Sequence, residues 1–293
     1  MRCRLLLVPA IALALLAGAC GDDDQQARTT GDSRSTSTTA GEQDDRGAQD
    51  DLPDGVVDGS KVENPLLTLD VHGGFVPVEV NVGNTAEVVV LSDHRVISGA
   101  PTIAIYPGPA LPAFQVSTAD RGRLDEAIAG FEALDPDADY DQGTSNQVAD
   151  APFTTVTLHD EGRTTSITGY ALGMGDATGP RAALQAVVDR INGLATATGE
   201  TPYEPTALRV HDVTEQAGPR PEPTPGEPSG TVRDWPIPHS GAACSVVSEP
   251  AQVRAALEVL RASTQLDWFR TDVGERRLVV VPLLPGDPGC PRD

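Results

Sequence analysis

The stretch FTTVTLHDEGRTTSITGYAL, residues 153–172, decides the fold that the sequence predicts. Its two halves, Phe153 to His159 and Thr164 to Leu172, are rich in Val, Ile and Thr, which favour β-strands. The polar loop Asp160-Glu161-Gly162-Arg163 lies between them. Two such runs joined by a short loop that contains glycine predict an antiparallel β-hairpin.

Short runs of the same kind come before the hairpin, and Gly, Asn, Asp or Pro separates each from the next. They predict strands at Leu66 to Val71, Phe75 to Val82, Ala86 to Leu91, His94 to Ile97, Thr102 to Tyr106 and Phe114 to Ser117. Two amphipathic helices are predicted to pack on this sheet, one from the N-cap Asp120 to about Leu134 and one that begins at Pro180. The expected fold class is therefore α+β, with a mainly antiparallel sheet and two packing helices.

A proline-rich segment at 215–230 predicts an extended linker between two folded parts. We expect an α+β domain at 61–214 and a small α/β unit at 231–293. The small unit has a predicted helix from about Pro250 to Ala262 and a strand at Leu278 to Leu284. A unit of this size needs a covalent staple or a docking surface on the first domain.

The first 20 residues predict export from the cytoplasm. Arg2 and Arg4 precede the apolar run Leu5 to Leu16, and small residues follow it before Cys20. This run is 12 residues long, whereas a membrane-spanning helix needs about 20. The pattern indicates a signal peptide at 1–19, and no transmembrane helix is expected.

The residues Leu16-Ala17-Gly18-Ala19-Cys20 resemble the lipobox of bacterial lipoproteins. The resemblance implies cleavage after Ala19, acylation of Cys20 and attachment to the outer side of the cell membrane, although the family prefers Leu at the place of Ala17. An ordinary secretory signal is the alternative. With Cys3 removed and Cys20 acylated, Cys244 and Cys290 remain, and an oxidising compartment predicts a disulfide between them. A thiol nucleophile or a metal site would need a His partner or a CxxC spacing that the sequence lacks.

Composition limits the partners that the chain can bind. It has 43 acidic against 21 basic side chains, a net charge of −22, which argues against an electrostatic nucleic-acid binder. Residues 20–60 are mostly Asp, Gln, Ser, Thr and Gly, and they predict a disordered acidic tether. An acidic tail that binds a partner is the alternative for this segment.

The acidic run at 135–141 is the most chemically suggestive stretch. Asp135, Asp137, Asp139 and Asp141 stand at alternate positions, and carboxylates so arranged are typical ligands of calcium. An EF-hand loop would have Gly at Tyr140 and Glu at Asn146, counting from Asp135, so the match is partial. A solvated acidic turn is the alternative. Apart from calcium at this run, no cofactor is expected.

No catalytic residue is assigned from the sequence. Four of the five His lie near an Asp, but adjacent strand residues point to opposite faces, so only Asp70 and His72 would share one. The glycine-rich run Gly173–Gly179 lacks Rossmann spacing and predicts a turn. Neither a G-x-S-x-G nor an H-E-x-x-H motif is present, although a triad built from distant residues stays open.

Four stretches, Gly73–Pro77, Tyr106–Pro112, Tyr170–Gly173 and Pro282–Pro285, look like those of actinobacterial lipoproteins of unknown activity. That resemblance implies a cell-surface lipoprotein with an α+β body and supplies no site residue. We expect a non-enzymatic protein that binds an envelope protein or another envelope component. The alternatives are a small-ligand or calcium binder and a hydrolase with a dispersed active site.

Overall fold

The structure is a computed structural model that describes residues 57–58, 65–141, 148–160, 162–174, 178–195 and 200–290. These residues belong to one compact unit, Asp51–Asp293. The predicted signal peptide, Cys20 and nearly all of the predicted tether lie outside the described residues. Val57–Asp58, expected at the end of the tether, instead form the short strand β1, which pairs with β8. No helix in the described ranges is both long and apolar enough to span a bilayer.

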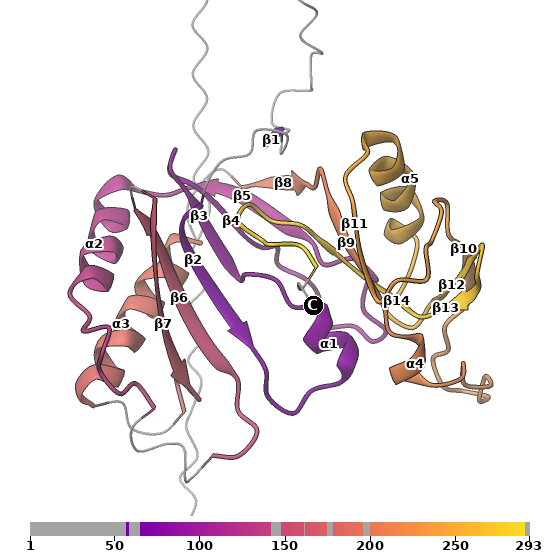
Figure 1. The fold of residues 1–293 in the computed structure, drawn as a ribbon, viewed down its shortest axis with the longest axis horizontal. Helices are drawn as coiled ribbons and strands as arrows, with labels where there is room; N and C mark the ends of the chain where they lie inside the picture. The colour runs from indigo at the N-terminus through magenta and orange to yellow at the C-terminus, as the bar shows by residue number, and fades with distance from the viewer. Residues whose placement is uncertain are drawn as a thin grey trace, which may run out of the picture. The chain divides into compact units, whose positions relative to one another are not determined.

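The largest element is an eight-stranded sheet in the order β1-β8-β5-β4-β3-β2-β6-β7 (Figure 1). All of its pairs are antiparallel except β1 with β8. The strands after β1 are β2 (Pro65–His72), β3 (Val88–Leu91), β4 (Arg95–Gly99), β5 (Phe114–Thr118), β6 (Phe153–Asp160), β7 (Arg163–Tyr170) and β8 (Thr201–Glu204). The α+β class predicted from the sequence is confirmed, and β6 and β7 form the predicted hairpin.

Two helices cover one face of this sheet, α2 (Arg121–Glu132) and α3 (Gly179–Leu194). The Asp120 carboxylate caps α2 by accepting a hydrogen bond from the Arg123 N–H. Leu67 of β2 and Ile191 of α3 are among the fully buried residues of the core between helices and sheet. Burial of each such side chain contributes about 1.5–3 kcal/mol to folding.

The opposite face of the sheet is covered only in part. Over β3, β4 and β5 it carries a second core, in which Val89 and Ile97 pack with Leu284 from the C-terminal segment. On β6 and β7 the same face bears Thr and Ser side chains, and the Thr155–Thr168 and Thr157–Ser166 hydroxyl pairs across the hairpin are exposed. The hairpin end of the sheet is therefore open on its second face.

Two three-stranded sheets, ordered β11-β9-β14 and β10-β12-β13, form the rest of the unit. Their strands are β9 (Leu208–Asp212), β10 (Val232–Asp234), β11 (Cys244–Val247), β12 (Trp268–Thr271), β13 (Gly274–Arg276) and β14 (Leu278–Pro282). Helix α5 (Pro250–Arg261) packs on them, and the short α4 (Thr214–Ala217) follows β9. Strand β9 comes before the proline-rich segment, but it pairs with β11 and β14, which come after it.

The predicted disulfide joins Cys244 at the start of β11 to Cys290 near the end of the chain. The residues lie 46 apart in sequence, so the bond closes most of the C-terminal part into one loop. Beside it, the His211 ring lies 3.9 Å from the Cys244 sulfur. The bond fixes β11 to the segment that follows β14.

Two of the predicted strands are wrong. Gly73 and Gly74 have φ angles of 79° and 84°, which turn the chain after β2, and the helix α1 (Val78–Val82) follows Pro77. Residues 102–106 form no strand, and Ile103 is 78% exposed. Prolines at 101 and 107 flank this run and cannot donate to a sheet ladder. The following turn packs on the C-terminal part through the Ala110 N–H, which donates to the Ser263 carbonyl.

Candidate functional site

The four carboxylates of the predicted calcium loop lie on the turn that follows α2. Asp135 Oδ1 accepts a hydrogen bond from the Asp137 N–H, and Asp139 Oδ1 accepts one from the Asp141 N–H, both at 3.0 Å. Asp141 Oδ1 accepts the Tyr170 N–H at 2.7 Å. Within the described ranges, no group of three or more His, Cys, Asp or Glu is placed to hold a metal ion. Calcium binding at this turn stays a prediction.

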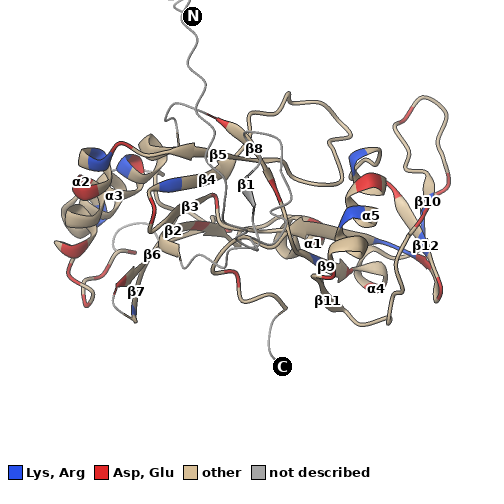
Figure 2. Cartoon of the chain, turned by 90° about the horizontal axis from the view of Figure 1, so that it is seen from above, with Lys and Arg blue, Asp and Glu red and all other residues tan. Residues whose placement is uncertain are grey.

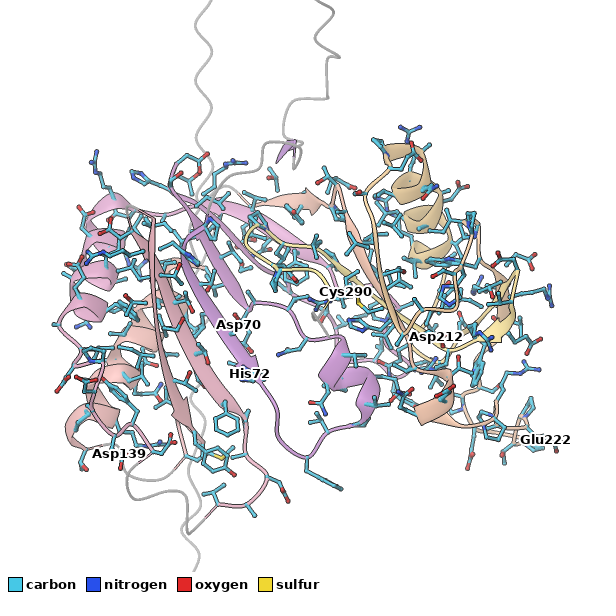
Figure 3. The ribbon with its side chains drawn as sticks, in the orientation of Figure 1. Asp70, His72, Asp139, Asp212, Glu222 and Cys290 are labelled. Carbon is cyan, nitrogen blue, oxygen red and sulfur yellow. A yellow bond between two sulfur atoms is a disulfide. The ribbon has the colours of Figure 1, made fainter. Side chains whose placement is uncertain are left out.

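Asp70 and His72 share one face of β2, and Figure 3 shows them far from Asp139. The His72 ring stacks on Phe153, with the ring centroids 5.9 Å apart. Burial raises the pKa of Asp70, His72 partly offsets this rise, and the charge of Asp287 adds to it. Asp70 is therefore coupled by charge both to His72 and to the C-terminal segment.

Two other sequence pairs, Asp93–His94 and His159–Asp160, each contain a residue that contacts a side chain outside the pair. The Asp93 carboxylate lies 2.6 Å from Arg95 Nε. His159 Nδ1 lies 3.2 Å from Thr164 Oγ1, across the hairpin. These contacts agree with the prediction that adjacent residues on a strand point to opposite faces and do not form Asp–His dyads.

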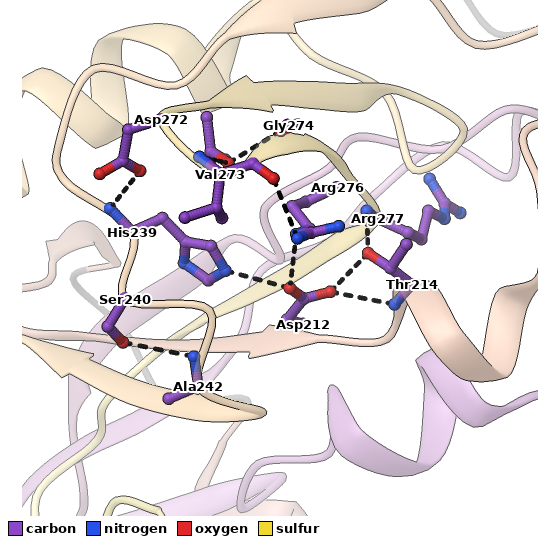
Figure 4. A network of polar contacts seen from close by, with 11 residues as sticks. Asp212, Thr214, His239, Ser240, Ala242, Asp272, Val273, Gly274, Arg276 and Arg277 are labelled. Atoms are coloured by element: carbon purple, nitrogen blue, oxygen red, sulfur yellow. Dashed lines mark hydrogen bonds and ion pairs between the residues drawn. The ribbon is translucent and has the colours of Figure 1, made fainter.

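Asp212, the sequence neighbour of His211, contacts His239 instead, which is the one His with no Asp within two residues in the sequence (Figure 4). Asp212 Oδ2 lies 3.1 Å from His239 Nε2 and 3.3 Å from Arg276 Nε. Asp212 Oδ1 accepts hydrogen bonds from the Thr214 N–H at 3.0 Å and from its hydroxyl. Thr214 Oγ1 in turn accepts the Arg277 N–H at 2.8 Å. One carboxylate thus joins β9, the loop before β11 and the end of β13.

This network is buried, which determines what it can do. The side chains of His239 and Asp212 are only 2% and 10% exposed. Burial raises the pKa of Asp212, but the hydrogen bonds from Thr214 and His239 outweigh this effect, so the net pKa is lowered. Asp212 is therefore held as a charged acceptor at the centre of the network. Without access for a substrate, the network cross-links the small sheets instead of forming an open active site.

The candidate binding feature of this fold is the outer edge of β7. Its position at the end of the strand order leaves this edge without a partner strand in the described part of the chain. The Ala171 N–H bonds to the Pro152 carbonyl, toward β6, whereas the Tyr170 N–H bonds to the Asp141 side chain. Because backbone groups alternate in direction along a strand, those of Thr164, Ser166 and Thr168 point away from β6. No described group occupies these outward donors and acceptors.

The end of β7 is held rigidly. Arg181, a buried residue of α3, donates to the carbonyls of Tyr170 (2.7 Å), Tyr140 (3.2 Å) and Ala171. The buried Tyr140 hydroxyl donates to the Asp135 carbonyl at 2.8 Å. These bonds tie the last residue of β7 and the turn after α2 to one guanidinium, so this end of the edge strand is fixed within the fold.

A cavity of about 220 Å³ lies on the helix side of β7. Its lining includes the apolar side chains of Phe131, Leu134, Leu158 and Ile167. Pockets for drug-sized ligands measure roughly 300–1,000 Å³, so this one suits a single side chain better than a cofactor. An edge strand beside such a pocket is the arrangement that binds an added strand, because main-chain bonds supply affinity and the pocket supplies specificity.

Comparisons with known proteins give no family for this chain. No family model, curated protein or solved structure matches it. The resemblance to actinobacterial lipoproteins therefore stays a prediction, and the case for function rests on the geometry of the site.

The surroundings of the cavity are acidic. Residues 131–141 contain five carboxylates and no Lys or Arg. Glu132, Asp135, Asp137 and Asp139 are exposed, and the acidic turn after α2 is visible in Figure 2. At the cavity mouth, Arg163 Nη2 lies 3.8 Å from Asp160 Oδ2. We call the four exposed carboxylates, Glu132, Asp135, Asp137 and Asp139, the acidic lip.

Proposed function

We propose that this protein is a non-enzymatic binding protein of the cell envelope, which captures an extended segment of a partner protein by adding it as a strand beside β7. The observation that carries the proposal is the row of outward backbone groups at Thr164, Ser166 and Thr168. An unpaired strand edge is a template for another strand.

Rigidity of the edge supports this function. The bonds that Tyr170 makes with Arg181 and Asp141 fix one end of β7, and the pairing of Arg163 with Asp160 fixes the other. Binding to a preformed edge avoids the cost of ordering the protein side of the interface. Only the partner segment would lose conformational freedom on binding.

Backbone hydrogen bonds alone would give little net binding free energy, so side-chain contacts must contribute as well. Three residues with one N–H and one C=O each offer up to six hydrogen bonds, and each bond contributes about 0.5–1.5 kcal/mol net. Their sum, roughly 3–9 kcal/mol, is comparable with the estimated 4–15 kcal/mol cost of association. The cavity beside β7, whose lining mixes apolar side chains such as Phe131 and Ile167 with charged ones such as Glu132, offers further contacts that selective binding requires.

The N-terminal segment supplies the proposed location. The resemblance of Leu16–Cys20 to a lipobox supports an acylated Cys20 at the outer face of the cell membrane, and two acyl chains give a stable anchor. The predicted tether of about 40 residues would have an r.m.s. reach of roughly 35 Å if it behaves as a random coil, so the binding edge would meet partners that stand off the membrane. Release of a Cys20→Ala variant into the medium is the expected result. Unchanged membrane association would contradict the anchor.

The test of function is in-cell crosslinking of the tagged full chain, followed by mass spectrometry. Ser166→Pro removes one outward N–H, whereas Ser166→Val is the matched control that keeps it. We expect one dominant partner with the wild type and with Ser166→Val, and its loss with Ser166→Pro. An unrelated lipoprotein with the same signal and tether gives the background.

A folding check accompanies the crosslinking. Each variant is unfolded in urea, and Thr164→Pro replaces Ser166→Pro if the latter is destabilised. Recovery of the same partner by a folded proline variant would refute strand addition at β7. The absence of any partner above background would refute the binding function itself.

A further inference from the structure

The position of the cavity determines which side chains of an added strand it can receive. Side chains of a strand alternate between the two faces of a sheet. Beside β7, alternate partner residues would lie on the helix side, where Thr165 and Ile167 line the cavity together with Phe131 and Leu134 of the α2 end. The remaining partner residues would lie on the open face, next to the Thr and Ser hydroxyls. One partner side chain, of aliphatic character, fits the cavity.

The acidic lip determines the charge of the neighbouring partner residues. Glu132 lines the cavity, and Asp135 and Asp137 are exposed on the turn beside it. Arg163, which also lines the cavity, pairs with Asp160. The excess carboxylates favour Lys or Arg on the helix side of the added strand, two residues before or after the aliphatic one.

Charge also distinguishes this partner from two other possible occupants of the edge, residues 21–60 of the same chain and a second copy of the chain. Residues 21–60 carry 11 acidic and 3 basic side chains, and a second copy carries a net charge of −22. Both would bring negative charge to the acidic lip, where like charges repel. Charge complementarity therefore favours a basic segment of a different protein.

We infer that the free edge of β7 binds a basic extended peptide, which places one aliphatic side chain in the cavity under β7 and flanking Lys or Arg residues against the acidic lip. This inference rests on the proposed function and names the chemistry of its partner.

Synthetic peptides test the inference directly. The mature lipidated chain is placed in nanodiscs of zwitterionic lipid, and empty nanodiscs are the control. The probe is a fluorescent, end-capped peptide Thr-Lys-Thr-Val-Thr-Lys-Thr, compared with a form that has Glu in place of Lys and a form that has Gly in place of Val. We expect the Glu peptide to bind at least tenfold more weakly, and the Gly peptide about tenfold more weakly because the buried aliphatic side chain is lost.

Two controls assign the binding to this site. N-methylation of alternate peptide residues blocks one edge of the added strand at a time, so one methylated set should abolish binding and the other should retain it. Glu132→Gln with Asp135→Asn and Asp137→Asn should remove the preference for Lys over Glu. The control Asp125→Asn with Glu126→Gln, which removes two exposed carboxylates earlier on α2, should keep it.

The outcomes separate the two levels of the proposal. Equal binding of the Lys and Glu peptides, together with loss of binding to Ser166→Pro, would overturn the basic-peptide inference and leave strand addition in place. Binding that survives both methylated sets and the Ser166→Pro change would refute strand addition. Self-association of the chain that Ser166→Pro abolishes would identify a second copy as the occupant and overturn the inference.

Discussion

Replacement of Asp267 by Ala should destabilise the C-terminal part strongly. The carboxylate is only 3% exposed and accepts hydrogen bonds from the Thr231 N–H (2.7 Å), the Thr231 hydroxyl (3.0 Å), Arg233 Nε (2.8 Å) and the Thr264 N–H (2.9 Å). It joins the start of β10 to the turn before β12. The substitution leaves four donors without their acceptor, and loss of one member of a buried charged pair costs about 3–5 kcal/mol.

Urea unfolding of the disulfide-intact chain measures this cost. The matched control is Asp234→Ala. This change removes an ion pair of similar length, 2.7 Å between Asp234 and Arg270, in which the Asp234 side chain is 81% exposed. An exposed pair contributes about 0–1 kcal/mol, so the control should unfold close to the wild type. If Asp267→Ala also unfolded within about 1 kcal/mol of the wild type, the assignment of stability to burial and hydrogen bonding of this carboxylate would be refuted.

Three further predictions concern stability. Joint replacement of Cys244 and Cys290 by Ala should cost about 4 kcal/mol for a sequence separation of 46, measured by urea unfolding in oxidising buffer, and an unchanged midpoint would contradict it. Asp212→Asn should destabilise most at neutral pH: burial raises the pKa of Asp212, but hydrogen bonds led by those from Thr214 lower it overall. The stabilisation is therefore complete above the unfolded-state pKa of about 3.9 and is lost as the pH falls through the lower folded-state pKa, so a wild-type advantage that grew in acid would be inconsistent. Ile191→Ala, at a fully buried site, should lower the free energy of unfolding by about 2–5 kcal/mol, and a loss below 1 kcal/mol would argue against close packing of α3 on the sheet.

Local patterns in the sequence predict the elements whose signals are themselves local. The hairpin at 153–172 and the helices with regular apolar spacing, α2, α3 and α5, are present close to their expected bounds. The run Phe75–Val82 has the alternation typical of a strand, but the turn at Gly73 and Gly74 ends β2 and the chain then forms the short helix α1. None of the α1 side chains is buried, so the alternation does not mark a buried sheet face here.

Short strands are predicted where the run is rich in Val, Ile or Thr, as for β3, β4, β5 and β14, whereas β8 and β9 are missed. Strand β9 pairs with β14, about 70 residues away, and neither strand specifies that partner locally. The same limit applies to the site residues. His239 meets Asp212 across 27 residues, so a search for neighbouring Asp and His selects the wrong His for Asp212. The edge position of β7 follows from the strand order, which the sequence does not contain.

The other edge strands of the described sheets are short or protected, in contrast to the edge strand β7. Natural sheets blunt their edges with short strands, charges, proline or a covering segment. Edge strands β10 and β13 have three residues each and carry charged side chains, β14 ends in Pro282, and β11 begins at the disulfide. Strand β7 has eight residues, no proline and a single charged side chain. Under the proposed function, the acidic lip beside this edge, the longest in the described sheets, would repel other copies of an acidic chain and would leave the edge accessible to a basic strand.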